Sequence, residues 1–263
     1  MGTRIVAKGV DAEAFATELG VPVRTGVKGV FLVNTDEKKA SKNYAPGSTK
    51  NGTPVGSPAM TAQYGFLSGI KSGVSQHIET DIVETENFTW IAAVKADMSD
   101  PLWPATPADA QIPVAIRANP VSSFSPSTAN KIGAGIYTYT NQKYGMSIGV
   151  LADGSTNGSF AINLDADMSK FNIVAFRFNV ATKTLSAKNY FTGVLRSSAL
   201  AANQVRQTSG RKIRLGASSE GTYGGKIYVA AAQIHDVALS DADMDKNALF
   251  LKAYCERKGI VFG

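Results

Sequence analysis

Short segments rich in β-branched and aromatic residues recur along most of this chain, and clusters of Gly, Asn, Ser and Pro separate them. Residues 172–180 (NIVAFRFNV) show the pattern well, because Val174, Phe176 and Phe178 alternate with Ala175 and Arg177. Such alternation is typical of a strand with one face in a core. Strands at intervals of roughly 8–14 residues predict an all-β fold, an antiparallel β-sandwich of the jelly-roll kind.

The expected strands begin with residues 28–34, and a long loop over residues 35–62 follows them. The further strands are expected at residues 88–96, 112–118, 132–139, 144–151, 159–164, 172–180, 184–190, 212–217 and 226–235. The spacing of the apolar residues then changes from the strand period to the helical period. Residues 240–258 carry apolar residues at helical spacing, Ser240 and Asp243 start a capping box, and Gly259 follows. One C-terminal helix is therefore predicted.

The first 23 residues differ in character from the rest. Residues 11–19 (DAEAFATEL) have the pattern of two helical turns, and Pro22 ends that pattern. We expect residues 1–23 to form an N-terminal arm or docking segment, and residues 24–263 to form the jelly-roll domain. Two interpretations stay open for the arm: it docks on another molecule, or it is a lead-in to the first strand.

Composition excludes several classes of protein. The 263 residues include 44% hydrophobic and 18% charged residues, which is typical of a globular chain. The net charge of +6 lacks a long Lys/Arg cluster, so no nucleic-acid partner is expected. No apolar run reaches the ~20 residues that span a membrane, so no membrane insertion is expected. The N-terminus lacks the apolar stretch of a signal peptide, which predicts a protein made and kept in the cytoplasm.

Metal and cofactor chemistry finds little support in the sequence. Cys255 is the single cysteine, and His77 and His235 are the only histidines. These are too few ligands for a zinc site, no phosphate-binding loop motif is present, and no cofactor is expected. Asp153 and Asn157 in LADGSTNGS could supply oxygen ligands to calcium, but a plain Asp-Gly turn explains them better.

The stretch HIETDIVETENFTW, residues 77–90, places Glu79, Asp81 and Glu84 in the order E-x-D-x-x-E. This order resembles the catalytic strand of family 16 glycoside hydrolases, in which Glu79 would be the nucleophile, Asp81 its helper and Glu84 the acid/base. A retaining mechanism needs two carboxyl groups about 5–5.5 Å apart. On a regular strand Glu79 and Asp81 share a face and Glu84 lies on the other, so catalysis requires a β-bulge between them.

A non-catalytic interpretation of the same stretch is preferred. Thr80 stands where the hydrolases usually have an aliphatic residue, and the chain has only Trp90 and Trp103 to build an aromatic cleft. Trp90 is expected in the core. In this interpretation HIET closes one strand, DIVETEN is a polar turn with Glu84 in water, and FTWIAAV is the next strand.

Two longer stretches carry a second resemblance. NYAPGSTKNGTPVGSPAMTAQYGFLSGIKSGVSQHIET (43–80) and RKIRLGASSEGTYGGKIYVAAAQIHDVALSDADMDK (211–246) resemble the opening and closing segments of concanavalin A-like (laminin-G-like) jelly rolls. Within that family the chain looks similar to modules of bacteriophage tail fibres, tail tips and capsid decorations. The resemblance implies the fold, and it leaves function open because this fold hosts lectins, hydrolases and structural modules.

A tyrosine cluster is the candidate binding site. In IYTYTNQKY, Tyr137, Tyr139, Asn141 and Tyr144 combine aromatic faces with a hydrogen-bonding amide, as glycan-binding surfaces do. The alternative is a ladder of tyrosines that covers a sheet.

These observations favour a non-enzymatic virion protein, assembled in the host cytoplasm. Its jelly roll would face outward toward host-surface glycans, and its N-terminal arm would contact other virion proteins. A homo-oligomer, by analogy a trimer, is expected. The alternatives are a family 16-like hydrolase that uses Glu79 and Glu84 on β-glucans, and a lectin with no virus attached.

Overall fold

The computed structural model describes residues 16–68, 75–97, 118–124, 132–139, 143–152, 156–218 and 225–263. The described elements are, in chain order, β1 (Val27–Leu32), α1 (Glu37–Ser41), β2 (Thr53–Val55), β3 (Gly65–Ser68), β4 (His77–Val83), β5 (Phe88–Ala96), β6 (Val121–Ser122), β7 (Ala134–Tyr139), β8 (Lys143–Ala152), β9 (Thr156–Asp165), β10 (Asn172–Asn179), β11 (Thr184–Asn189), β12 (Leu195–Ala199), β13 (Gln204–Gln207), β14 (Lys212–Leu215), β15 (Lys226–His235) and α2 (Asp241–Arg257).

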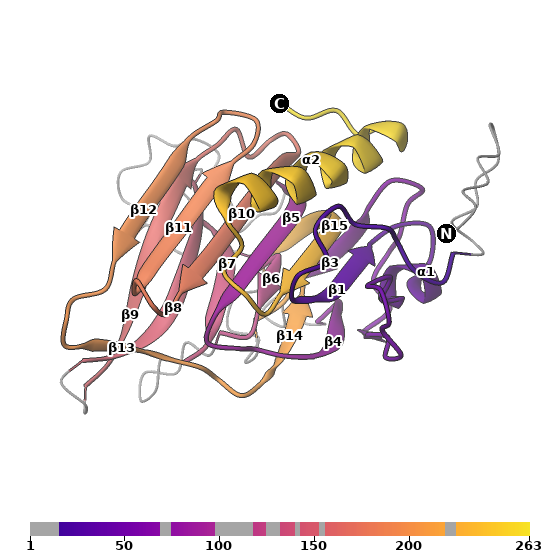
Figure 1. Cartoon of the computed structure of the whole chain (residues 1–263). Helices are drawn as coiled ribbons and strands as arrows, with labels where there is room; N and C mark the ends of the chain where they lie inside the picture. Colours follow the sequence, from indigo (N-terminus) through magenta and orange to yellow (C-terminus); the bar gives the residue numbers. More distant parts are fainter. Residues whose placement is uncertain are drawn as a thin grey trace, which may run out of the picture.

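These strands form two antiparallel sheets packed face to face (Figure 1). Within the described residues, the first sheet has seven strands in the order β1-β15-β5-β10-β11-β12, with β3 also paired to β15. The second has eight strands in the order β13-β8-β7-β6-β14-β4-β2, with β9 also paired to β8. The predicted β-sandwich of jelly-roll kind is therefore confirmed, since sequence neighbours such as β14 and β15 lie in different sheets.

The main core lies between the two sheets. Trp90 and Phe176 point into it from the first sheet, and Ile136 and Met146 point into it from the second; each is at most 1% exposed. This core explains the alternation in residues 172–180, because Val174, Phe176 and Phe178 all belong to it. The expectation that Trp90 is a core residue is confirmed.

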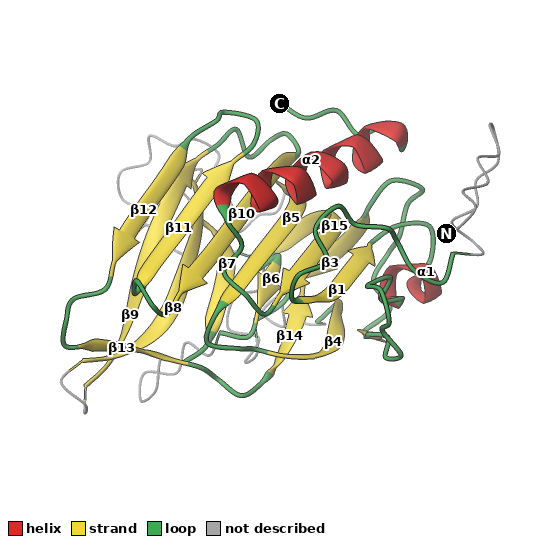
Figure 2. Ribbon diagram, in the orientation of Figure 1, coloured by secondary structure: helices red, strands yellow, loops and turns green. Residues whose placement is uncertain are grey.

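A second core lies on the other face of the first sheet, under helix α2 (Figure 2). Met244, Ala248, Leu251 and Cys255 point from α2 onto this sheet, as their helical spacing predicts. The Ser240 side chain accepts a hydrogen bond from the backbone N–H of Asp243, so the predicted cap is formed. Among the described helices, none is long and apolar enough to cross a membrane.

The described part of the expected N-terminal arm, residues 16–23, packs against this second core. Val21 is 3% exposed and Val23 is 9% exposed. Asn247 of α2 pairs with both backbone groups of Val23, at 3.0 Å to its N–H and 3.1 Å to its carbonyl. His235 of β15 lies beside them, with Nδ1 2.9 Å from the Thr25 carbonyl and Nε2 3.2 Å from Asn247. Residues 21–25 are therefore held between β15 and α2 by these hydrogen bonds, and this contact is here named the clasp.

Several local predictions need correction. The loop expected over residues 35–62 contains α1 and β2, and residues 195–199 and 204–207 form strands that were not predicted. The sequence LRSSA has little apolar alternation because β12 is an exposed edge strand. The sequence QVRQ of β13 also has little apolar alternation. Residues 16–19 are not helical, and residues 11–15 lie outside the described part. Of the strand expected at residues 112–118, only Ala118 is described, and it is not in a strand.

Candidate ligand-binding groove

The acidic strand β4 runs further than predicted and contains an irregularity. Residues 81–83 continue the strand instead of forming a turn. Glu79 pairs with Arg214 and Val83 with Lys212, so four steps along β4 match two steps along β14. A bulge between Asp81 and Glu84 is the condition that catalysis requires. Because the surplus is two residues, however, the alternation of faces is restored beyond it, and Glu84 remains on the face opposite to Glu79.

Glu84 lies between the sheets and not in water, which corrects the expectation of an exposed turn. Its side chain is 0% exposed and forms an ion pair with Arg206 of β13, which is 3% exposed. Ser123 and Ser209 donate their hydroxyls to the same carboxylate at 2.7 and 2.8 Å. The Arg206 guanidinium lies 4.7 Å from the ring centre of Phe88, a core residue. The Glu84 carboxylate is therefore enclosed by protein partners inside the fold.

Glu79 faces the opposite way, onto the outer face of the second sheet. Its Oε2 accepts hydrogen bonds from Nε and Nη2 of Arg214 at 3.1 and 2.9 Å. Glu79 and Glu84 thus lie on different faces of one sheet and have separate cationic partners. The two carboxylates do not converge on one cleft, as a retaining glycosidase requires.

The tyrosines expected to bind glycans are divided between the two faces of β7 and β8. Tyr137 and Tyr139 share the outer face, with ring centres 4.7 Å apart and their hydroxyls 3.1 Å apart. Tyr144 belongs to the core, where its hydroxyl donates to the Val94 carbonyl at 3.3 Å. Asn141 lies outside the described residues. The structure brings Tyr137 and Tyr139 together and separates Tyr144 from them, and a glycan role for these residues stays a prediction.

The remaining candidate residues from the sequence do not form a site among the described residues. His77 and His235 lie in different sheets, as their strands β4 and β15 require. Burial, and next the nearby Arg214, lower the pKa of His77 to about 4. Within the part of the chain that the structure describes, no group of His, Cys, Asp and Glu side chains is arranged to hold a metal ion. Asp153 lies outside that part.

A groove lies at the edge of the sandwich, between the loop over residues 43–51 and the end of β4. The loop over residues 43–51 makes one wall, and Asn43 holds this loop to β1. The Asn43 side chain accepts from the backbone N–H of Val30 at 3.0 Å and donates to the Lys28 carbonyl at 2.8 Å. Asn51 closes the other end of the loop, because its side chain accepts from the Asn43 N–H at 3.1 Å.

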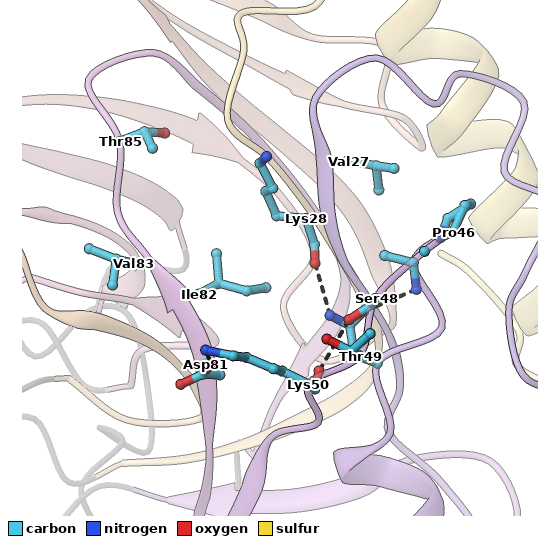
Figure 3. Close-up of a pocket in the computed structure, with 13 residues that line it drawn as sticks. Val27, Lys28, Pro46, Ser48, Thr49, Lys50, Asp81, Ile82, Val83 and Thr85 are labelled. Carbon is cyan, nitrogen blue, oxygen red and sulfur yellow. Dashed lines mark hydrogen bonds and ion pairs between the residues drawn. The ribbon is translucent and has the colours of Figure 1, made fainter.

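The larger cavity of this groove lies between that loop, the start of β1 and the end of β4 (Figure 3). Its volume is about 470 Å³, within the range of small-molecule sites. Figure 3 shows Ile82 and Val83 on one side and Val27 and Pro46 on the other. The hydroxyls of Ser48 and Thr49 and the ammonium groups of Lys28 and Lys50 supply polar contacts. No aromatic side chain lines it among the described residues.

A smaller cavity of about 260 Å³ adjoins the first, and Lys50 and Asp81 line both. Asp81 lies between two lysines, 2.7 Å from Lys50 and 2.8 Å from Lys212. Hydrogen bonds from Lys212 and then from Lys50 lower the pKa of Asp81 to about 2. These three residues, here named the Lys50–Asp81–Lys212 triad, mark the boundary between the two cavities.

No protein-family model and no curated protein matches this sequence. Solved structures do match. The ligand-binding domain of botulinum neurotoxin serotype D in complex with N-acetylneuraminic acid has a TM-score of 0.56 at 12% identity, over 91% of this chain and 53% of that one. The type G receptor-binding domain has a TM-score of 0.52 at 13% identity, over 78% and 48%. The CBM40 of a Ruminococcus gnavus IT-sialidase has a TM-score of 0.43 at 17% identity, over 63% and 82%.

The likenesses to the two botulinum structures support the fold assignment. At such identities they carry no residue of a site from one protein to the other. This chain spans about half the length of the botulinum structures, so their ligands can lie in the half that has no counterpart here. The sequence alone does not reveal the groove, because its walls come from the 43–51 loop and from β4, which are distant in the chain. Among the lining residues, Glu79, Thr80 and Asp81 stood out in the sequence, but as members of a catalytic motif.

Proposed function

We propose that this protein is a non-enzymatic, glycan-binding β-sandwich module. The observation that carries the proposal is the groove between the 43–51 loop and β4. It combines apolar walls with hydroxyl and ammonium groups in a cavity of about 470 Å³. Sugars present hydroxyl groups around an apolar ring face, so a few fixed polar groups beside apolar walls suit them. The fold shared with structures that carry N-acetylneuraminic acid agrees with this role.

The position of the carboxylates favours binding over hydrolysis. Glu84 is enclosed by Arg206, Ser123 and Ser209, and it has no path to a bound sugar. Glu79 is paired with Arg214, so its carboxylate is engaged by a cation. The two lysines lower the pKa of Asp81, so Asp81 is not suited to act as a general acid. A module of this kind holds its ligand without cleaving it.

The biological setting belongs to the same proposal. Residues 43–80 and 211–246 resemble concanavalin A-like jelly rolls, and the N-terminal lead-in, the single cysteine and the C-terminal helix resemble phage modules of that kind. These resemblances favour a virion component, with the N-terminal segment contacting other virion proteins or sister subunits. Its glycan-binding groove would then meet the host surface. Residues 16–25 run toward the domain through the clasp at Asn247, which gives a firm attachment for whatever precedes them.

A glycan array with the intact protein tests the binding function. Thr49→Trp adds a bulky side chain at an exposed position that lines the larger cavity, so it should abolish array binding without unfolding the protein. Thr192→Trp, at an exposed turn between β11 and β12, is the matched control and should bind as the original protein does. Equal binding by both variants would place the glycan elsewhere. Absence of binding to any glycan would refute the proposal.

A further inference from the structure

We infer that the groove selects acidic sugars, with a sugar carboxylate binding at the Lys50–Asp81–Lys212 triad. This inference rests on the proposed glycan-binding function and names its ligand class. The triad lies where the two cavities meet, so a sugar seated in the larger cavity would present a substituent to both lysines. The carboxylate would accept hydrogen bonds from Lys50 and Lys212 alongside Asp81.

The balance of charge in the groove is the first argument. Lys28 is matched by Asp236 at 3.0 Å, and Glu79 is matched by Arg214 at 2.9 Å. In the triad, two lysines share the single carboxylate of Asp81. Counting +1 for each lysine and −1 for Asp81 leaves one uncompensated positive charge. An anionic ligand group would neutralise it.

The accessibility of the lysines is the second argument. The Lys50 side chain is 74% exposed and that of Lys212 is 48% exposed, whereas Asp81 is 25% exposed. An ammonium group has three N–H donors, and each of these lysines is seen to use one on Asp81. Donors therefore remain on both lysines for a group that arrives from solvent. Charge-assisted hydrogen bonds of this type are stronger than neutral ones.

The absence of aromatic side chains from the described walls is the third argument. A neutral sugar relies heavily on an aromatic face, since its hydroxyls exchange hydrogen bonds with water at little net gain. The apolar side chains of the described walls are all aliphatic: Val27, Ala45, Pro46, Ile82 and Val83. A charged contact has to supply the missing affinity, and the triad is the site in the groove that can supply it.

The test uses matched pairs of glycans that differ only in the charge of one carboxylate: sialyllactose with its methyl ester, and galacturonic acid with its methyl ester. Isothermal titration should show that the acidic member of a pair binds about tenfold tighter. Lys50→Gln should weaken binding of the acidic member about tenfold and leave the neutral member unchanged. Asp81→Asn should act in the opposite direction and tighten acidic binding, because it raises the excess charge from one to two.

A matched control and distinct failures complete the design. Lys246→Gln removes an exposed lysine of α2 that also pairs with one aspartate, and it should change nothing. Equal affinity for both members of every pair would overturn the acidic preference and leave the proposed function intact. Weakening by both Lys50→Gln and Asp81→Asn would mean that the triad only shapes the groove, and would also overturn it. If neither pair binds, the acidic preference fails, and the proposed function fails with it only when the glycan array also shows no binding.

Discussion

Glu84 of β4 and Arg206 of β13 form an ion pair that is sealed between the two sheets, with side chains 0% and 3% exposed. Arg206 also donates to the backbone carbonyls of Thr85 and Glu86, so it holds the β4–β5 connection onto the end of the second sheet. A carboxylate that resembles a catalytic acid in the sequence therefore serves as a structural anchor.

Removing one partner of this pair should strongly destabilise the protein. Arg206→Met leaves the Glu84 carboxylate buried without a cation, and such losses cost about 3–5 kcal/mol of unfolding free energy. Denaturant titration at neutral pH measures it. Arg196→Met is the control, because Arg196 is 57% exposed, pairs with Asp165 at 3.7 Å, and should cost under about 1 kcal/mol. Equal small effects would contradict the anchoring role.

Acidification should destabilise the protein in two separate windows. Burial lowers the pKa of His77 from 6.5 to about 4, so between these values the unfolded chain binds a proton that the native protein does not. The unfolding free energy should therefore fall as pH drops from 6.5 to about 4, and the His77 contribution should then level off. Burial also lowers the pKa of His235, which adds an effect of the same sign. Denaturant titrations across this range check it, and His77→Asn should flatten the slope.

At pH values below that window, the protonation of carboxylates lowers the unfolding free energy. Hydrogen bonds from two lysines lower the pKa of Asp81 from 3.8 to about 2, so its stabilising contribution is complete above 3.8 and is lost as pH falls toward 2. Asp81→Asn should remove only this lower phase. A variant that changed the slope near pH 6 instead would contradict the assignment of the two windows.

The clasp on the N-terminal segment should depend on Asn247. Asn247→Leu leaves the buried N–H and carbonyl of Val23 without their partner, which should cost about 2–4 kcal/mol. Hydrogen exchange followed by mass spectrometry should show fast exchange over residues 19–25 while β10 stays protected. Asn179→Leu, at the last residue of β10, removes a side chain that accepts from the turn residue Ala181; it is the control and should leave residues 19–25 protected. Unchanged protection in Asn247→Leu would show that the apolar contacts of Val21 and Val23 suffice.

Assembly should depend on the residues that precede this clasp. A chain starting at residue 16 keeps Val21 and Val23 in the second core, so it should fold with unchanged stability. Deletion to residue 23 would confound assembly with folding, because it removes both valines. If the N-terminal segment mediates assembly, light scattering should give an oligomer for the full chain and a monomer for the chain that starts at residue 16. The same mass for both would remove support for the docking role.

The sequence by itself determined the strands that have clear apolar alternation, and where the long helix begins and ends. The bounds of β5 and β15 and the Ser240 cap of α2 follow from local alternation and capping, which depend on neighbours within a few residues. Only the tertiary structure decided which face each side chain uses and what it meets. Tyr144 faces inward because the pairing of β7 with β8 sets its face. Glu84 faces inward because β4 continues through residues 81–83, so its regular alternation places Glu84 opposite to Glu79. The groove required the 43–51 loop to meet β4, and no local pattern encodes such a contact, since it depends on how distant segments pack against each other.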